Sequence, residues 1–157
     1  MRIIQLNHDT FLPWKEQIAE LLNISAHINF PEQVLSASYG SNKCADLEAY
    51  LKDGSAVVFC AVEQEKLLGW IWCHSIRRLT QTRLHIAEIA VSEDCRNKGV
   101  GRQLLENAEA YAVEHGIREI DLLVTASNAA AVAFYEKMSF SPERYLMKKT
   151  VESKYKE

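Results

Sequence analysis

The sequence lacks the features that mark a membrane protein, a long linker or a repeat protein. Its 157 residues contain only three prolines and six glycines, so no segment has the composition of a long flexible linker. No apolar run approaches the roughly 20 residues that a helix needs to cross a bilayer. No internal repeat or low-complexity segment interrupts the chain. We therefore expect a protein without a membrane partner.

Concentrated charge and paired cysteines are also missing. The formal net charge of −3 offers no basic surface of the kind that nucleic-acid binding requires, so we expect no nucleic-acid partner. The four cysteines are scattered without a C-x-x-C pair, at Cys44, Cys60, Cys73 and Cys95. This spacing argues against a zinc site, and unpaired thiols are typical of a reducing compartment. We expect no bound metal and a cytoplasmic location.

What the sequence does contain is the composition of one globular domain. Hydrophobic residues make up 48% and charged residues 25% of the chain, which are ordinary values for a domain with a buried core. We expect a single domain over residues 1–150. The charged residues 151–157 are expected to form a C-terminal tail.

The hydrophobic pattern switches between strand-like and helix-like periods along the chain. Short apolar runs bounded by turn residues predict strands at 1–6, 56–62, 67–75, 84–91 and 120–124, with one or two more within 140–150. Apolar stripes with helical spacing predict helices at 14–22, 45–51, 100–115 and 129–138. Asp9 or Thr10 is expected to cap the first helix, and residues 77–83 to form a basic connector. This order predicts an α/β fold: a mixed, mostly antiparallel sheet of six or seven strands with helices on both faces.

The loop that follows the strand 84–91 has the chemistry of an anion site; it reads Arg-Asn-Lys-Gly-Val-Gly-Arg over residues 96–102. Gly99 and Gly101 let the backbone turn tightly, so that successive N–H groups converge on one ligand. The helix that begins here adds unsatisfied N–H groups and the positive end of its dipole. Formal charge comes from three side chains: Arg96, Lys98 and Arg102. The pattern predicts a phosphate or pyrophosphate ligand.

This loop differs from the common phosphate loops and resembles the signature of one family. It lacks the G-x-x-x-x-G-K-[ST] pattern of nucleoside-triphosphate binding, and Leu104 stands where a dinucleotide fingerprint has its third glycine. The remaining R-x-x-G-x-G-R resembles the R/Q-x-x-G-x-G/A signature of the GNAT superfamily of N-acetyltransferases. The resemblance implies that the pyrophosphate of acetyl-CoA is held by Arg96, Asn97, Lys98, Gly99, Val100, Gly101 and Arg102.

A second stretch, residues 128–140, resembles the later motif of the same family. Taken alone, its alanine-rich helix with an aromatic pair is typical of ordinary packing. It also matches N-x-x-A-x-x-F/L-Y-E-K/R-x-G-F, apart from Ser139, which stands where the family has glycine. The resemblance implies cofactor contacts from Asn128 at the pantetheine, Tyr135 near the thioester sulfur, and Ala131 and Phe134 beside them.

The resemblance also gives roles to the strand before the loop and to Tyr135. In GNAT proteins this strand splays from its neighbour, so its free backbone groups can pair with the pantetheine amides like an added strand. In this sequence those groups belong to Ile89, Ala90 and Val91. Tyr135 is the expected acid that protonates the departing thiolate; the alternative is a core tyrosine whose hydroxyl is satisfied within the protein.

Two residues of the strand 84–91 compete as the general base that takes the proton of the acceptor amine. Strict alternation places His85 with Ile89 on one face and Glu88 with Ala90 on the other, and a bulge would reverse this assignment. Several family members have a base an even number of residues before the position of Val91. His85 fits that phase, and a histidine titrates near neutral pH. Glu88 is costly among apolar neighbours unless it is paired or used, and water or a residue elsewhere is the third alternative.

The resemblance implies an N-acetyltransferase that moves an acetyl group from acetyl-CoA directly to a primary amine of a small molecule or of a protein or peptide. The alternative, from another class, is a CoA-binding sensor or scaffold without turnover. Residues 124–128 also resemble ribosomal-protein alanine acetyltransferases, but Leu123 stands where those enzymes have an acidic residue, so that substrate is not assigned. GNAT relatives are often homodimers, and the short segment after Phe140 leaves the acceptor site open or closed by another subunit.

Overall fold

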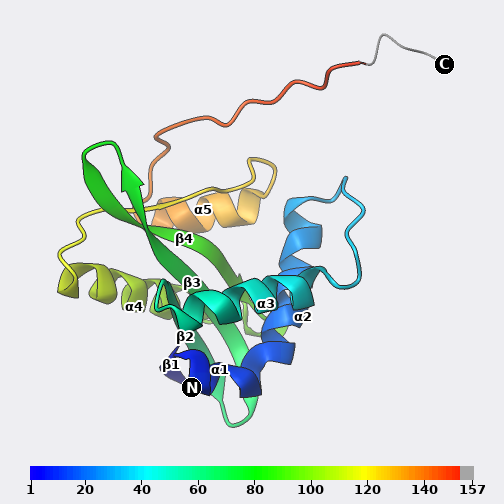
Figure 1. Ribbon diagram of the computed structural model, residues 1–157. Coiled ribbons are helices and arrows are strands. Elements are labelled where there is room, and N and C mark those ends of the chain that lie inside the picture. Colours follow the sequence, from blue (N-terminus) through cyan, green and yellow to red (C-terminus); the bar gives the residue numbers. More distant parts are fainter. Residues whose placement is uncertain (153–157) are drawn as a thin grey trace.

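In the computed structural model, which describes residues 1–152, a five-stranded sheet crosses the molecule in the order β1-β2-β3-β4-β5 (Figure 1). The strands are β1 Arg2–Leu6, β2 Ala56–Glu63, β3 Lys66–Arg78, β4 Gln81–Val91 and β5 Ile120–Leu122. Neighbours from β1 to β4 are antiparallel, and β5 is parallel to β4. The predicted mixed, mostly antiparallel α/β sheet is confirmed, but the described residues form five strands instead of six or seven.

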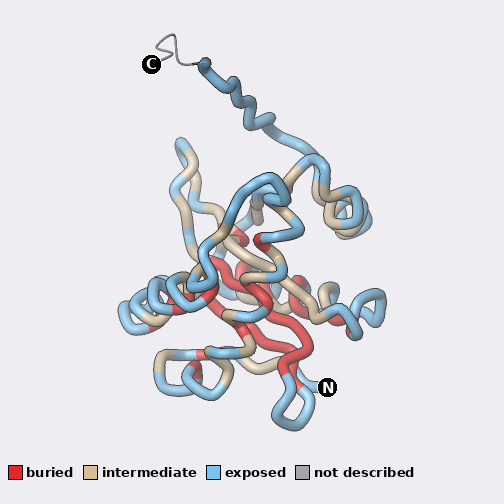
Figure 2. Tube along the Cα trace, turned by 90° about the vertical axis from the view of Figure 1, so that its right-hand side faces the viewer, coloured by how far each residue is buried: buried red, intermediate tan, exposed pale blue. Residues whose placement is uncertain are grey.

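Helices cover both faces of the sheet. One face packs against α1 His8–Phe11, the short turn η1 Leu12–Trp14, α2 Lys15–Asn29 and α3 Tyr39–Lys52. The other face packs against α4 Val100–Glu114, and α5 Ala129–Lys137 follows β5. The buried apolar side chains gather in two clusters, one on each face. Figure 2 shows these buried residues concentrated along the central strands.

Helices on both faces of the sheet explain the near-continuous apolar runs of β2 and β3, because side chains that point to either face are buried. Cys60 and Trp70 belong to the cluster beneath α2 and α3, whereas Phe59 and Ile71 belong to the cluster beneath α4. Full burial of a large apolar side chain contributes about 1.5–3 kcal/mol to stability. The two central strands therefore form a rigid platform for β4.

A close crossing of α2 and α3 fixes the helical layer over this platform. A Cβ atom added to Gly40 would lie 2.1 Å from the carbonyl oxygen of Ala19, so only glycine fits at this point. The Gly40 N–H also donates to Asn23 Oδ1 at 2.8 Å. The crossing brings the second half of α2 over β4, which it contacts.

Two predicted helix boundaries are wrong. The first long helix continues beyond residue 22 to Asn29, because buried Ala26 carries its apolar stripe another turn. The next helix begins at Tyr39 instead of 45, because its first turn packs through Gly40. Both differences arise from contacts between helices, which cannot be predicted from the hydrophobic periodicity of one segment alone.

The predicted cap and the predicted basic connector also need correction. Asn7 caps α1, accepting from the N–H groups of Asp9 and Thr10 at 2.9 and 3.0 Å. Residues 77–83 lie in the arms of a tight hairpin between β3 and β4, whose turn places Leu79 at a φ of 44°. Pairing of the arginine-rich arms with each other extends both strands beyond their apolar parts.

The strands predicted within residues 140–150 are absent from the described part of the chain. Residues 141–152 are exposed throughout and run away from the body of the molecule (Figures 1 and 2). A strand requires pairing with a neighbouring strand, and residues 141–152 pair with none. The predicted tail at 151–157 lies outside the described residues from 153 onward.

Candidate functional site

The strand β4 is paired on both sides in its first part and on one side only in its second part. Pairing with β5 covers Leu84 to Ile86 and ends at Leu122. The following residues of β4 pair only with β3, with Ile89 opposite Ile71 and Val91 opposite Gly69. The backbone groups of residues 87–91 therefore have no strand partner on the side away from β3, and we call this unpaired side of β4 the opening. The predicted contact residues Ile89, Ala90 and Val91 all lie in this opening.

A β-bulge at the start of this opening changes which side chains share a face. Glu88 is opposite Trp72 and Ile86 is opposite Cys73, so Ala87 is an additional residue in β4. The bulge shifts the alternation by one residue, which places Glu88 on the same face as His85. The strict alternation predicted for these two residues is wrong. Both lie on the face covered by α2 and α3.

Glu88 is the end of a chain of hydrogen bonds that crosses the opening. Ser25 Oγ, on α2, donates to Glu88 Oε1 at 2.7 Å, and Asn29 Nδ2 donates to Ser25 Oγ at 3.3 Å. Asn128 Nδ2 then donates to Asn29 Oδ1 at 2.9 Å. Burial raises the pKa of Glu88, while the bond from Ser25 and the charge of Lys43 lower it by less. Glu88 is thus a carboxyl group with a raised pKa beside the unpaired backbone of β4.

Two tyrosines are close enough to Glu88 to respond to its charge. Burial and then the Glu88 charge raise the pKa of Tyr135 to about 12, and they raise the pKa of Tyr39 as well. The Tyr135 ring lies edge-on to Phe134 and Phe140, at centroid distances of 5.3 and 5.6 Å. Both phenols are therefore protonated at neutral pH.

Asn128, predicted to contact a pantetheine, has structural partners at both ends of its amide. Its Oδ1 caps α5 by accepting from the Ala131 N–H at 3.2 Å, and its Nδ2 donates to Asn29. The cap places Ala131, Phe134 and Tyr135 on one short helix beside the opening. A contact of Asn128 with a ligand stays a prediction.

The loop from Ser92 to Gly99 ends in a turn that exposes backbone donors. Asn97 and Gly99 have φ values of 60° and 81°, in the left-handed region that suits glycine. The first helical bond of α4 runs from Gln103 N–H to the Gly99 carbonyl, so the N–H groups of residues 100–102 have no acceptor within the helix. No side chain within residues 1–152 caps them. A Cβ atom on Gly101 would lie 3.3 Å from the Phe134 ring, which places this donor cluster against α5.

The charge of the predicted anion loop is accessible. Arg96, Asn97, Lys98, Gly99 and Arg102 are exposed, whereas Val100 is buried and anchors the helix. Beneath the loop, η2 Glu93–Cys95 carries Asp94, which forms an ion pair with Lys66. The loop is therefore anchored at η2, and within residues 1–152 its three cationic side chains form no ion pair.

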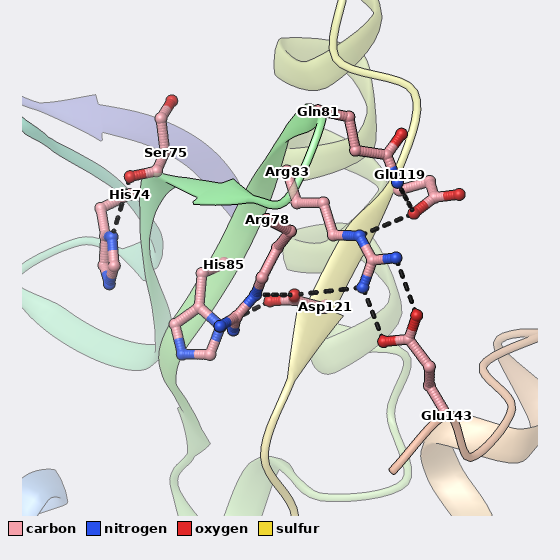
Figure 3. Close-up of polar contacts among 9 residues, drawn as sticks. All are labelled: His74, Ser75, Arg78, Gln81, Arg83, His85, Glu119, Asp121 and Glu143. Atoms are coloured by element: carbon pink, nitrogen blue, oxygen red, sulfur yellow. Dashed lines mark hydrogen bonds and ion pairs between the residues drawn. The ribbon is translucent and has the colours of Figure 1, made fainter.

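The paired part of β4 carries a different cluster, which is drawn in Figure 3. His85 Nδ1 lies 2.6 Å from Asp121 Oδ1, and Arg78 Nε donates to Asp121 Oδ2 at 2.9 Å. Partial burial of Asp121 opposes ionisation, but these two bonds hold the pKa of its carboxyl below the ordinary value. Arg83 donates to both carboxylate oxygens of Glu143 at 2.7 and 2.8 Å. His85 is therefore held by Asp121, the residue opposite it in the β4–β5 pairing.

Four residues of this region were not predicted from the sequence: Ser25, Asn29, Tyr39 and Asp121. A signal existed only for Asp121, which is an acidic residue in an otherwise apolar strand. The other three lie far from β4 along the chain, so the sequence gives no sign that they approach Glu88 in the fold.

The hollows found in the described chain lie away from the predicted site residues. A hollow of about 460 Å³ beside Tyr111, His115 and Ile117 contains none of the predicted site residues. No group of three or more His, Cys, Asp or Glu side chains within residues 1–152 could hold a metal ion. In the same range, no helix has both the length and the apolarity to traverse a bilayer.

Comparison with known proteins gives consistent matches. The chain matches the family described as Acetyltransferase (GNAT) family over residues 16–140. It is 30% identical over 88 residues to the uncharacterized N-acetyltransferase YycN of Bacillus subtilis (strain 168), covering 56% of each protein. It is 32% identical over 106 residues to an N-alpha-acetyltransferase of Saccharolobus solfataricus, covering 62% of this chain and 64% of that protein. The chain therefore spans less than two thirds of either relative.

A solved structure shares the fold over nearly the whole chain. A mutant BH1408 protein from Bacillus halodurans superposes with a TM-score of 0.81, covering 96% of this chain and 99% of that chain. At 21% identity this likeness concerns the fold alone.

Proposed function

The chain belongs to the GNAT family of acetyltransferases, and we propose that it transfers an acetyl group from acetyl-CoA directly to a primary amine. One observation carries this proposal. The unpaired half of β4 lies next to the open N-terminus of α4, so a row of strand donors and acceptors continues into a cluster of N–H groups. A ligand with amides at one end and a pyrophosphate at the other fits this order.

The two parts of the site would bind the two parts of the donor. The backbone of Ile89, Ala90 and Val91 would pair with the pantetheine amides as an added strand does. The N–H groups of residues 100–102 would bind the pyrophosphate, assisted by the charges of Arg96, Lys98 and Arg102. Phe134, which lies against Gly101, would separate these polar groups from the core.

Proton transfer would use the two partly buried titratable groups beside the opening, Glu88 and Tyr135. Glu88 would take the proton from the acceptor ammonium, because its raised pKa makes it a better base than an ordinary carboxylate. The free amine would attack the thioester carbonyl, forming a C–N bond, while an N–H of Ala90 or Val91 donates to the oxyanion. As the C–S bond breaks, Tyr135 would donate its phenolic proton to the sulfur, and the second proton lost by the attacking nitrogen would pass through water to restore the neutral phenol.

His85 is the competing base, and its environment argues for a different role. Asp121 fixes the His85 ring at the paired end of the strand, and the His74 ring lies beside it at a centroid distance of 5.2 Å. Glu88 is the residue whose charge reaches Tyr135. We therefore assign the proton-accepting role to Glu88 and a supporting role to His85.

The acceptor is proposed as a small-molecule amine or a protein or peptide amine, in the cytoplasm. A carboxylate and two phenols around the opening favour a cationic group on the acceptor, which an amine supplies when it is protonated. The similarity to an N-alpha-acetyltransferase supports a peptide N-terminus as one member of this class.

The test is release of the CoA thiol from acetyl-CoA in the presence of a panel of amines that includes a diamine, an amino sugar and a peptide with a free N-terminus. We expect amine-dependent thiol release and an acetylated product detected by mass. A CoA-binding sensor or scaffold would bind the donor and release no thiol with any member of the panel. That second outcome would contradict the proposed transfer.

A further inference from the structure

One of the two carboxylate oxygens of Glu88 is held by a hydroxyl from the helical layer. Ser25, in the second half of α2, donates from Oγ to Glu88 Oε1 at 2.7 Å, a length typical of a hydroxyl bonded to an ionised carboxylate. Among the residues that the structure describes, no other side chain bonds to Glu88. The second oxygen, Oε2, is therefore left for the acceptor amine.

The direction of this hydroxyl follows from a hydrogen bond that begins at the backbone of α5. A backbone N–H can only donate, so the Ala131 N–H, 3.2 Å from Asn128 Oδ1, fixes the oxygen end of the Asn128 amide toward α5. The nitrogen end of Asn128 then faces Asn29, where it donates to Oδ1 at 2.9 Å. One backbone donor thus determines the orientation of both side-chain amides.

The last two bonds carry this direction to the carboxylate. Because Asn29 Oδ1 accepts, its Nδ2 is turned to Ser25 Oγ and donates to it at 3.3 Å. A hydroxyl has a single hydrogen, and the one on Ser25 is directed to Glu88. Every bond of the chain therefore donates toward Glu88, and a donor to a carboxylate favours its ionised form.

Other groups around Glu88 act on it through charge and not through a bond. The titratable groups that face it or share its face of the sheet are Lys43 and Tyr39 on α3, Tyr135 on α5, His85 on β4 and His74 on β3. Burial opposes ionisation of Glu88, and the Lys43 charge favours it. Within residues 1–152, the Ser25 hydroxyl is thus the direct polar contact of this carboxylate.

We propose that Ser25 is a positioning residue for the base, whose hydroxyl fixes the orientation of Glu88 and favours its ionised form. Asn29 and Asn128 act through Ser25 by giving its hydroxyl this direction. The inference rests on the proposed role of Glu88 in acetyl transfer. Because the chain begins at the N-cap of α5, the helix that carries Tyr135, one set of bonds links the positions of the proposed base and the proposed acid.

The titration of Glu88 itself tests the inference without turnover. Carbon NMR of the side-chain carboxyls, with the Glu88 signal assigned by its loss in Glu88→Gln, measures the pKa directly. Ser25→Ala should raise this pKa, with about a tenfold fall in the acid dissociation constant, because the ionised form loses a charge-assisted bond. Ser25→Thr keeps the hydroxyl and should keep the natural pKa. An unchanged pKa in a folded Ser25→Ala protein would overturn the proposal.

A double-mutant cycle tests the part of the chain behind Ser25. Asn29→Leu should raise the pKa of Glu88 by less than Ser25→Ala does, and it should add nothing when Ser25→Ala is present. Asn42→Leu is the matched control, since Asn42 donates to Ser38 Oγ with the same four-residue spacing on the exposed side of α3. Equal effects of Asn29→Leu in both backgrounds, or a comparable effect of Asn42→Leu, would contradict the chain.

Thiol release from acetyl-CoA separates this inference from the proposed function. In Ser25→Ala the acid limb of kcat/KM should move to higher pH, so the loss of rate on this limb should be about tenfold greater than the loss at the plateau. Ser25→Thr should restore the natural profile. An unchanged profile in an active Ser25→Ala protein would overturn the positioning role. Absence of turnover in the natural chain would instead contradict the proposed function, and the NMR titration would still decide whether Ser25 acts on Glu88.

Discussion

The two halves of β4 differ in how they are paired and in whether their polar groups have partners within the protein. Residues 81–86 are paired with β3, residues 84–86 are also paired with β5, and the side chains of Arg83 and His85 have carboxylate partners in Glu143 and Asp121. Residues 87–91 are paired on one side only and carry the partly buried carboxyl of Glu88, which accepts its hydrogen bond from Ser25. The change occurs at the bulge of Ala87, where pairing with β5 also ends. The paired half of β4, whose polar groups have partners within the protein, thus supports the half whose backbone groups can bind a ligand.

Replacing Glu88 should have the largest effect, because it removes the proposed base from the open half. Glu88→Gln is expected to lower kcat by about 10²–10³, within the usual range for a general base. The variant should keep its affinity for CoA, since no donor contact is assigned to this side chain. Steady-state kinetics together with calorimetry measure both quantities.

The matched variant for this prediction is His85→Asn in the paired half, which keeps a side chain capable of hydrogen bonding. We expect a loss of less than about tenfold in kcat for it. A greater loss for His85→Asn than for Glu88→Gln would reverse the assignment of the base.

Tyr135→Phe should have the next largest effect. It removes the phenolic proton but keeps the ring against Phe134 and Phe140, so the protein should fold and bind CoA normally. We expect kcat to fall by about ten- to a hundredfold, because water can replace the acid inefficiently. An unchanged kcat would remove Tyr135 from the proton transfer.

Asp121→Asn tests the paired half, where we expect a loss of stability. The substitution leaves Arg78 and His85 without their charged partner and should lower the free energy of unfolding by about 1–3 kcal/mol. The pKa of Asp121 is lowered in the folded state, so its contribution is present above the unfolded pKa and disappears as the pH falls through the folded pKa.

Denaturant unfolding of both proteins at pH 7 and pH 3 would measure this difference. Gln81→Ala, which removes an exposed bond to Glu119, is the control with little expected effect. Equal stability of Asp121→Asn and the natural chain at pH 7 would show that the cluster contributes nothing to the paired half.

The smallest expected effect is the pH dependence contributed by Glu88. Its pKa is raised in the folded state, so the folded protein binds this proton more tightly and the ionised form costs stability as the pH rises. Glu88→Gln lacks this cost. Its Tm should exceed that of the natural chain at pH 8, and the difference should shrink to nothing near pH 4. The opposite trend would mean that ionised Glu88 is stabilised by its surroundings.

The sequence best predicted the parts of the molecule whose structure depends on residues close together along the chain. The loop before α4 follows from Gly99 and Gly101, and the helix that follows it from a single apolar stripe, so both lie within a residue of their expected positions. The opening of β4 was expected from the family resemblance, and the strand pairing places it at Ile86.

What the sequence did not predict depends on contacts between distant segments. The bulge at Ala87 is a property of the register with β3, so alternation within β4 alone assigned Glu88 to the wrong face. Ser25 and Asn29 reach the site only because Gly40 lets two helices cross closely. The terminal strands predicted within 140–150 are absent because residues 141–152 pair with no strand, which the side-chain pattern of the segment itself does not reveal.

The central claim is that the open half of β4 and the N-terminus of α4 bind the pantetheine and pyrophosphate of acetyl-CoA. Titration calorimetry with CoA tests it on the natural chain and on Gly101→Glu, with Gly101→Ala as the control that adds only a methyl group. We expect saturable binding by the natural chain, a loss of at least a hundredfold in affinity for a folded Gly101→Glu protein, and less than tenfold for Gly101→Ala. No heat with the natural chain, or equal affinity in the folded Gly101→Glu protein, would contradict the assignment.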